Sequence, residues 1–385
     1  MKQTEYFGED SLEQLIHIAQ KHKAKKVLVV TGKKSFLLSG AKAYLSNLFE
    51  DIKVVRFSDF EVNPQLEDVW GGIKILRDFE PQLIVAIGGG SVIDMAKLVN
   101  CFAANTHRDA VDIIEDPKLI KHEGLPLVAV PTTAGTGSES THFAVVYVLG
   151  KKYSLAHDFI LPSYIILDPR LLLEVPQGIA ATSAMDALSQ AIESYWALGS
   201  NSESQALSRE AIKIILENIV PAVIMKEKVA IQELFLGSNL AGKAINIAKT
   251  TAPHAISYSI TKRHNVPHGH AVALTLGSFF IINSRKDLPL NGLRGQEHLD
   301  AIMTDLFRLF SCNSGLECAE KIHEIMRLIG LETDATKLGL ISESQIDFIV
   351  DSINLERLSN NPIKISNTIL KFAIESNYHE LRGTL

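Results

Sequence analysis

The chain has 385 residues, of which 46% are hydrophobic and 21% are charged, and its formal net charge is −6. This is the composition of a soluble globular protein, and the length favours two domains over a single core. The negative net charge argues against nucleic acid as the main partner, because nucleic-acid binders usually carry a basic face.

The first half of the chain alternates strand and helix patterns. Short apolar or β-branched runs predict strands, at 26–31, 52–56, 83–87, 125–130, 145–148 and 164–167. Helical periodicity occupies 65–77 and 92–102. Because such alternation is typical of a doubly wound parallel sheet, we predict an α/β domain over residues 1–175.

The pattern changes after Asp168-Pro169, where strand signals become rare. Long amphipathic segments follow instead, at 204–219, 230–247, 271–282 and 299–309. Pro176 and Gly178 mark the break, and the polar stretch 283–294 predicts a surface loop. We therefore predict an all-α second domain over residues 176–385.

Targeting and redox signals are few. The N-terminus, MKQTEYFGED, is polar and acidic, unlike a signal peptide, and no uncharged apolar stretch approaches the ~18 residues that a membrane span needs. Cys101, Cys312 and Cys318 fit neither a disulfide framework nor a zinc-finger spacing. We therefore expect a cytoplasmic protein with no membrane partner.

Two segments rich in glycine and hydroxyl groups follow strands of the predicted sheet. Gly88-Gly89-Gly90-Ser91 comes after the strand at 83–87, and PTTAGTGSE (131–139) comes after the strand at 125–130. Glycines let backbone N–H groups approach a phosphate, and ligands bind at the carboxyl edge of a parallel sheet. A tight turn capped by Ser91 and a flexible loop are the structural alternatives. The two segments support each other as a phosphate site.

A carboxylate and several imidazoles occur in the helical half. Asp186 lies in the segment AMDALSQAIESYW, and four histidines fall within 17 residues, at His254, His264, His268 and His270. A carboxylate and imidazoles from separate segments could form a divalent-metal site. Helix-terminus charges and hydrogen-bonded core histidines explain the same residues equally well.

Together these segments resemble the iron-containing (group III) alcohol dehydrogenase family over essentially the whole chain. The motifs follow the order and spacing of that family: Asn63-Pro64, GGGSVIDMAK (88–97), PTTAGTGSES (131–140), ILDP (166–169), MDALSQAIESY (185–195) and PHG (267–269). The resemblance implies the dehydroquinate synthase-like fold, a site between the two domains and a homodimer. It also implies an oxidoreductase that reduces a small aldehyde to a primary alcohol with NADP(H) or NAD(H) and a divalent metal, Fe²⁺ or Zn²⁺.

Carried over by position, the resemblance assigns site residues. The implied cofactor contacts are Gly32, Gly89, Gly90, Ser91, Asp94, Thr132, Thr133, Thr136, Ser138 and Lys152. Asp186, His254 and His268 match three of the four metal ligands of the family.

Two positions depart from the family pattern. The usual fourth ligand, a histidine one turn after the aspartate, is Gln190, which is implied as a weaker ligand and leaves the metal identity open. A second histidine, four residues after His254, is replaced by Tyr258. The proton relay therefore stays open among Tyr258, His264 and His270.

A narrower resemblance is to the phosphonoacetaldehyde reductase branch, which converts phosphonoacetaldehyde to 2-hydroxyethylphosphonate. It rests on KYSL (152–155), the helix with its glutamine, KTTAPH (249–254) and NNP (360–362). A phosphonate needs cationic donors, and Lys249, Arg263 and His142 are the candidates. The alternatives are a generic small-alcohol dehydrogenase, another dehydroquinate synthase-like enzyme, and a non-catalytic nucleotide-binding sensor.

The segment after the strand at 26–31 bears on the choice of cofactor. It reads Thr31-Gly32-Lys33-Lys34-Ser35, with no carboxylate to accept a ribose 2′-OH or to repel a 2′-phosphate. Lysine and serine could bind that phosphate, or the lysines could be merely solvated. We predict that NADPH is accepted.

Overall fold

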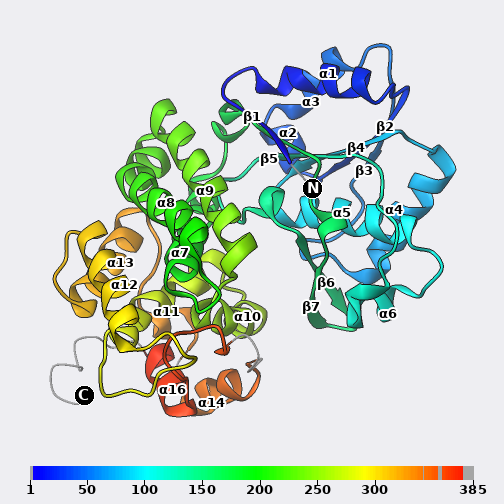
Figure 1. Ribbon diagram of the computed structural model, residues 1–385. Helices are drawn as coiled ribbons and strands as arrows, with labels where there is room; N and C mark the ends of the chain where they lie inside the picture. Colours follow the sequence, from blue (N-terminus) through cyan, green and yellow to red (C-terminus); the bar gives the residue numbers. More distant parts are fainter. Residues whose placement is uncertain (1–2, 341, 354–357, 376–385) are drawn as a thin grey trace. The chain divides into compact units, whose positions relative to one another are not determined.

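The computed structural model describes residues 3–340, 342–353 and 358–375 (Figure 1). By its internal contacts the chain divides into two compact units, Met1–Val175 and Pro176–Leu385. The two units are considered separately below.

The first unit is built on a six-stranded sheet in which every pairing is parallel, in the order β1-β8-β5-β4-β2-β3. The strands are β1 (Thr4–Phe7), β2 (Lys26–Thr31), β3 (Lys53–Phe57), β4 (Leu83–Gly88), β5 (Leu127–Pro131) and β8 (Tyr164–Leu167). The inner strands β4, β5 and β8 are buried at every residue, as expected for a parallel sheet covered on both faces.

Helices cover both faces of this sheet. They are α1 (Gln14–Lys21), α2 (Ser35–Leu38), α3 (Ala41–Leu48), α4 (Leu66–Phe79), α5 (Gly90–Ala104) and α6 (Ala110–Glu115). In Figure 1, α1 and α3 lie on one side of the sheet and α4 and α5 on the other, which is the arrangement that right-handed crossovers produce. The expected doubly wound α/β fold is therefore confirmed.

The direction in which the chain adds strands reverses between β2 and β4. From β2 the chain adds β3 on one side, and it then returns to add β4 on the other side of β2, followed by β5 and β8. Sheets of this kind bind ligands outside the carboxyl ends of the strands at the point of reversal. In this chain that point lies at Gly32 and Gly89.

A second, two-stranded antiparallel sheet belongs to the same unit. It consists of β6 (Phe143–Val148) and β7 (Lys151–Ala156), with Tyr147 opposite Lys152. Short 3-10 turns complete the unit at η1 (Ser11–Glu13), η2 (Pro117–Leu119), η3 (Ser138–Ser140), η4 (Asp158–Ile160) and η5 (Pro169–Leu172).

The described part of the second unit is helical, as predicted. Its helices are α7 (Gln177–Trp196), α8 (Ser202–Val220), α9 (Lys228–Ala248), α10 (Ala252–His264), α11 (His268–Asn283), α12 (Gln296–Leu309), α13 (Gly315–Leu328), α14 (Glu343–Asp351) and α16 (Asn367–Glu375), with short turns η6 (Pro221–Met225) and η7 (Ala335–Leu338). Helices α7, α8 and α9 pack against one another, and α11 contacts α7, α10 and α13. Because α11 is apolar on nearly every face, it forms the centre of this unit.

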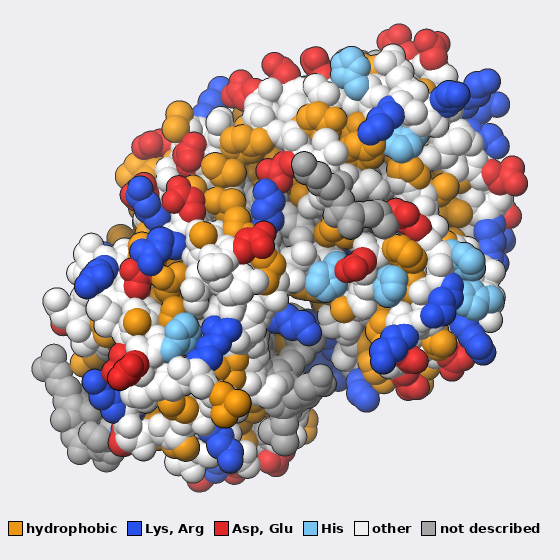
Figure 2. All heavy atoms as spheres, in the orientation of Figure 1, with side chains coloured by type: hydrophobic (Ala, Val, Ile, Leu, Met, Phe, Trp, Pro, Cys, Tyr) orange, Lys and Arg blue, Asp and Glu red, His pale blue; other side chains and the backbone are white. Residues whose placement is uncertain are grey.

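The surface carries charges of both signs. Lys and Arg side chains are interspersed with Asp and Glu over the face drawn in Figure 2. No helix among the described residues is long and apolar enough to cross a bilayer.

Candidate functional site

The glycine loop after β4 lies directly against the threonine-rich loop after β5. A Cβ added to Gly90 would lie 2.6 Å from Oγ1 of Thr136, and one added to Gly89 would lie 3.4 Å from Oγ1 of Thr133. The backbone N–H of Thr132 donates to the carbonyl of Gly88 at 3.0 Å. The two segments singled out in the sequence therefore form one surface at the N-terminus of α5, where unpaired N–H groups favour an anion.

Thr132 supplies evidence that this surface is built for a ligand. Its side chain is 2% exposed, and its hydroxyl has no hydrogen-bond partner among the described residues. Because a buried polar atom without a partner is unfavourable, a bound polar group at this position would relieve it. The loop thus fits the pyrophosphate of a dinucleotide.

A buried lysine on α5 holds the threonine-rich loop in place. The side chain of Lys97 is fully buried, and its Nζ donates to the carbonyls of Ser138 (2.6 Å), Thr141 (2.8 Å) and Phe143 (2.9 Å). Burial lowers the pKa of Lys97 to about 8 against the opposing charge of Asp94. Sequence reasoning missed Lys97, although a lysine on the buried face of an apolar helix was the available signal.

Asp94 is tied to the same loop. Its carboxylate accepts hydrogen bonds from the hydroxyl of Ser138 at 2.7 Å and from the N–H of Val145 at 3.0 Å, and burial raises its pKa. Lys152 on β7 is close enough for its charge to act on that carboxyl. These contacts give Asp94 and Ser138 a positioning role, and direct contact of either with a cofactor stays a prediction.

Ser91 and Gly32 anchor the neighbouring segments. Ser91 Oγ accepts from the N–H of Asn63 at 3.2 Å, and Asn63 itself adopts a positive φ of 67°. The carbonyl of Gly32 accepts from Arg56 Nη2 at 3.1 Å. Lys33, a candidate for a 2′-phosphate, instead pairs with Asp59 at 3.1 Å.

In the second unit, three predicted metal ligands come together. Asp186 lies on α7, His254 on α10 and His268 at the first residue of α11. One ligand atom of each lies within 4.8 Å of the others. Nε2 of His254 is 3.3 Å from Oδ1 of Asp186, and Nε2 of His268 is 3.9 Å from the same oxygen.

Hydrogen bonds on the far side of each imidazole fix its tautomer. His254 Nδ1–H donates to Glu193, and His268 Nδ1–H donates to the hydroxyl of Ser257 at 3.3 Å, while that hydroxyl donates to the carbonyl of His254 at 2.8 Å. Nε2 of each ring therefore faces the carboxylate of Asp186, where it can hold a proton or, without that proton, offer a lone pair. Because acceptors facing acceptors repel unless a cation lies among them, the donor set fits a divalent metal.

Glu193 is the functional residue of this unit that the sequence did not single out. It is fully buried, and its Oε2 also accepts from Thr251 N–H at 2.7 Å and Thr251 Oγ1 at 2.9 Å, at the N-terminus of α10. Burial alone would lower the pKa of His254, but the charges of Glu193 and Asp186 outweigh it and raise that pKa to about 10. The two carboxylates thus favour a positive charge at His254, either a proton on the ring or a metal ion beside it.

Gly269 explains how α11 reaches Asp186. A Cβ at this position would lie 2.0 Å from the carbonyl oxygen of Thr182 and 2.8 Å from Cβ of Asp186. The first turn of α11 can therefore touch α7 only because residue 269 has no side chain, and this contact brings His268 to the cluster.

Gln190 lies one helical turn after Asp186 and is buried. Its side-chain amide donates to the carboxylate of Asp186, and this hydrogen bond helps to hold the pKa of Asp186 below its ordinary value, against the opposing effect of burial. Gln190 is therefore oriented toward the ligand group, and its role as fourth ligand stays a prediction.

Of the three candidate relay residues, the structure brings Tyr258 to the cluster. Its ring stacks on that of His268, with centroids 5.3 Å apart and planes 8° apart. His270 donates from Nε2 to the carbonyl of Glu332, and His264 is the last residue of α10. Neither contact places these two imidazoles beside the ligands, so Tyr258 has the better position of the three, and the identity of the proton relay stays a prediction.

The three candidate substrate residues have different surroundings. Lys249 is exposed at the end of α9, directly before α10. The guanidinium of Arg263 stacks over the ring of Phe348, 4.2 Å from its centroid, which gives it a structural partner. His142 belongs to the first unit, where its ring meets that of Phe143 edge-on.

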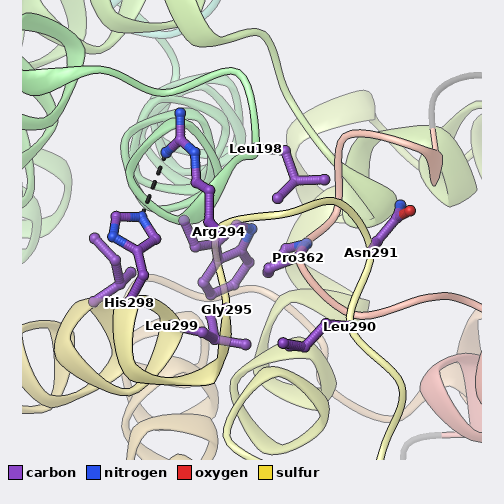
Figure 3. Close-up of a pocket in the computed structure, with 10 residues that line it drawn as sticks. Leu198, Leu290, Asn291, Arg294, Gly295, His298, Leu299 and Pro362 are labelled. Carbon is purple, nitrogen blue, oxygen red and sulfur yellow. Dashed lines mark hydrogen bonds between the residues drawn. The ribbon is translucent and has the colours of Figure 1, made fainter.

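A small pocket in the second unit contains none of the predicted site residues (Figure 3). It is lined by Trp196, Leu198, Leu290, Asn291, Arg294, Gly295, His298, Leu299, Ile302 and Pro362. Arg294 is engaged there by His298 at 3.4 Å and by Ser200. This pocket and the predicted metal-ligand cluster are therefore separate features of the unit.

Two family profiles together span most of the chain. "Iron-containing alcohol dehydrogenase" matches residues 3–169, and "Fe-containing alcohol dehydrogenase family, C-terminal" matches residues 180–377. The chain therefore belongs to the iron-containing alcohol dehydrogenase family. It is an NAD(P)-dependent alcohol dehydrogenase or aldehyde reductase of a family that uses a divalent metal, so a non-catalytic sensor is no longer an alternative.

Individual relatives agree with this assignment. The structure is similar to sulfoacetaldehyde reductase from Bifidobacterium kashiwanohense in complex with NAD⁺, with a TM-score of 0.84 and 32% identity, covering 100% of this chain and 98% of that one. The sequence is 29% identical over 377 residues to the NADPH-dependent butanol dehydrogenase of Clostridium saccharobutylicum, covering 93% and 94%. It is 31% identical over 276 residues to Alcohol dehydrogenase 4 of Saccharomyces cerevisiae, covering 70% and 72%.

Proposed function

We propose that this chain reduces a small aldehyde bearing an anionic group to the primary alcohol, with phosphonoacetaldehyde, which gives 2-hydroxyethylphosphonate, as the first candidate. Asp186, His254 and His268 hold the divalent metal, and Gln190 completes the site. The glycine and threonine loops of the first unit hold the dinucleotide.

The bound groups supply the reactive chemistry: the metal polarises the aldehyde oxygen as a Lewis acid, and the reduced nicotinamide supplies a hydride. The chain's own residues prepare the site for that chemistry. Glu193 and Ser257 fix the imidazole tautomers. Tyr258 lies against His268 and holds on its hydroxyl the proton that the product alcohol needs.

The backbone of Lys249 is the observation that carries the choice of an anionic substrate. It has φ 61° and ψ 176°, a region that residues other than glycine rarely adopt, at a strain of roughly 1–3 kcal/mol. Strain of this kind persists where the surroundings impose it, and it concentrates at ligand-binding sites. A lysine kept in a glycine conformation is best explained by a requirement for its ammonium group.

Asn360 imposes this conformation. Its side-chain amide donates to the carbonyls on both sides of Lys249, those of Ala248 and Thr250, each at 2.9 Å, and its Oδ1 accepts from the N–H of Gly199. Two residues further on, Thr251 is bonded to Glu193, which also bonds His254. The strained lysine is thus connected to the proposed metal site through a short run of fixed backbone.

One similar structure also supports an aldehyde substrate with an anionic group. The named substrate of the Bifidobacterium kashiwanohense enzyme, sulfoacetaldehyde, is an aldehyde with a sulfonate group. A phosphonate and a sulfonate both offer three oxygens to a cationic donor. The shared chemistry is a short aldehyde with a tetrahedral anion, and the experiment below separates the two.

Substitution of Lys249 by glycine tests the proposal, because it removes the ammonium group and the backbone strain together. We expect Lys249→Gly to unfold at a higher temperature than the wild type. We also expect it to lose ~10- to 100-fold in kcat/KM for phosphonoacetaldehyde, the equivalent of one charged hydrogen bond, and little for propanal.

The matched control is Lys226→Gly. Lys226 is also a lysine at positive φ (53°) after a helical segment, but it lies at the end of η6 and touches none of the proposed ligands. It should gain stability with no change in kinetics. Equal losses of Lys249→Gly on charged and uncharged aldehydes would contradict an anion-binding role, and a wild-type preference for sulfoacetaldehyde would move the substrate from phosphonate to sulfonate.

A further inference from the structure

The carboxyl ends of β2 and β3 carry an arginine that is held in place without a carboxylate partner. Arg56 lies on β3, opposite Val29 of β2. Its Nε donates to Thr31 Oγ1 at 2.7 Å, and its Nη2 donates to the carbonyl of Gly32 at 3.1 Å. The guanidinium also lies over the ring of Phe36, 4.9 Å from the centroid.

These three contacts leave donors available. All the partners of Arg56 are neutral, and among the described residues its Nη1 has no hydrogen-bond partner. The residue is exposed, so its charge is presented to solvent in a fixed orientation. A guanidinium fork held in this way suits a tetrahedral dianion better than a mobile ammonium group does.

Arg56 lies where a dinucleotide bound to this sheet would place its adenosine ribose. β2 pairs with β4 so that Thr31 lies opposite Ile87, which directly precedes the glycine loop. In doubly wound sheets the pyrophosphate lies at that loop, and the ribose 2′ position lies at the end of the adjoining strands, where an arginine accommodates a 2′-phosphate. Arg56 reaches this place by bending over the last residue of β2.

Lys33 of the same loop is less suited to that task. Lys33 pairs with Asp59 at 3.1 Å and with Glu61 at 3.8 Å, and the charges of these carboxylates act to raise its pKa. Its ammonium group is therefore already engaged by two carboxylates, although both pairs are exposed to solvent. Among the cations at this edge, Arg56 combines a fixed geometry with an uncompensated charge.

We propose that Arg56 is the residue that binds the 2′-phosphate of NADP(H) and thereby gives this chain a preference for NADP(H) over NAD(H). The proposal rests on the use of a nicotinamide cofactor by the family. It is independent of the aldehyde.

Calorimetric titration of the whole chain with NADP⁺ and with NAD⁺, in the absence of any aldehyde, tests the proposal. Wild-type protein should bind NADP⁺ more tightly. Arg56→Gln should weaken NADP⁺ binding ~10- to 100-fold and leave NAD⁺ within about twofold. Adenosine 2′,5′-bisphosphate should lose affinity in parallel with NADP⁺, whereas 5′-AMP should not.

Lys53→Gln is the matched control, because Lys53 is an exposed cation at the opposite end of β3. It should leave the ratio of the two affinities unchanged. Tighter binding of NAD⁺ by the wild type, equal losses of both dinucleotides in Arg56→Gln, or a loss of selectivity in Lys33→Gln instead would each overturn the proposal. Since no aldehyde is present, a failure of the proposed substrate leaves these results unaffected.

Discussion

The contact between Gly269 and α7 makes a sharp prediction about the metal site. Substitution of Gly269 by alanine places a methyl group 2.0 Å from the carbonyl oxygen of Thr182 and 2.8 Å from Cβ of Asp186. Neither partner is the free end of a flexible side chain: one is helix backbone and the other is the root of a proposed ligand. The first turn of α11 must therefore move away from α7.

The size of the movement follows from the distances. A carbon and a carbonyl oxygen approach to about 3.3 Å at closest, so the methyl group needs a shift of ~1.3 Å. Metal–ligand bonds of ~2.0–2.2 Å let two ligand atoms lie no more than ~4.4 Å apart. Since His268 Nε2 is 3.9 Å from Asp186 Oδ1, a shift of this size carries it beyond reach.

We therefore expect Gly269→Ala to lose at least ~100-fold in metal affinity, about 2.7 kcal/mol, and ~1–3 kcal/mol in unfolding free energy. Competition of the metal-free protein with a chromogenic chelator for Zn²⁺ measures the first, and urea unfolding measures the second. Gly178→Ala is the control, because a Cβ there meets nothing within 4 Å on the same helix α7. A folded Gly269→Ala protein with wild-type metal affinity would refute the reasoning.

Three further predictions concern neighbouring features. Glu193→Gln removes the charge behind His254 and should weaken metal binding ~10- to 100-fold in the same chelator competition, whereas unchanged affinity would reduce Glu193 to a structural residue. Gln190→His should hold the metal longer against a chelator, and full activity of wild-type protein shown to be metal-free by elemental analysis would remove the metal from the mechanism. Burial raises the pKa of Cys101 to about 12, so the thiol stays protonated at pH 9. Alkylation of Cys101 in the folded protein, mapped by mass spectrometry, should still climb about tenfold per pH unit from pH 9 to 11, where a peptide thiol has levelled off, and a plateau near pH 9 would contradict the burial.

Sequence patterns predicted the strands that contain a run of apolar or β-branched residues, including β3, which is mostly exposed. The predicted ranges 26–31 and 164–167 coincide with β2 and β8, which are continuous apolar runs. β1 and β7 were not predicted. β1 is a short edge strand with partly exposed residues, and β7 begins with two lysines and buries only Leu155, so neither has the uninterrupted apolar run on which the prediction relied.

The site residues found from sequence are those whose roles show in local spacing or in motifs. Glu193 and Lys97 were missed because their roles are set by distant partners. Glu193 is bonded to Thr251, 58 residues away, and Lys97 to the carbonyls of residues 41 to 46 positions away. Lys97 could have been noticed as a lysine within an apolar helix, but the partners of both residues are visible only once the other elements have packed around them.

Charge balance explains why the site tolerates a glutamine where the family usually has a histidine. Asp186 and Glu193 together bring two negative charges into the interior, and with a metal bound in place of a proton both imidazoles would present neutral Nε2 atoms toward it. Two buried carboxylates without a counter-charge are strongly unfavourable, and a single divalent cation offsets both. A neutral fourth donor leaves that balance unchanged whether it is an imidazole or an amide. We therefore expect Gln190 to alter how tightly and how selectively the metal is held, and Asp186 and Glu193 to set the requirement for a divalent cation.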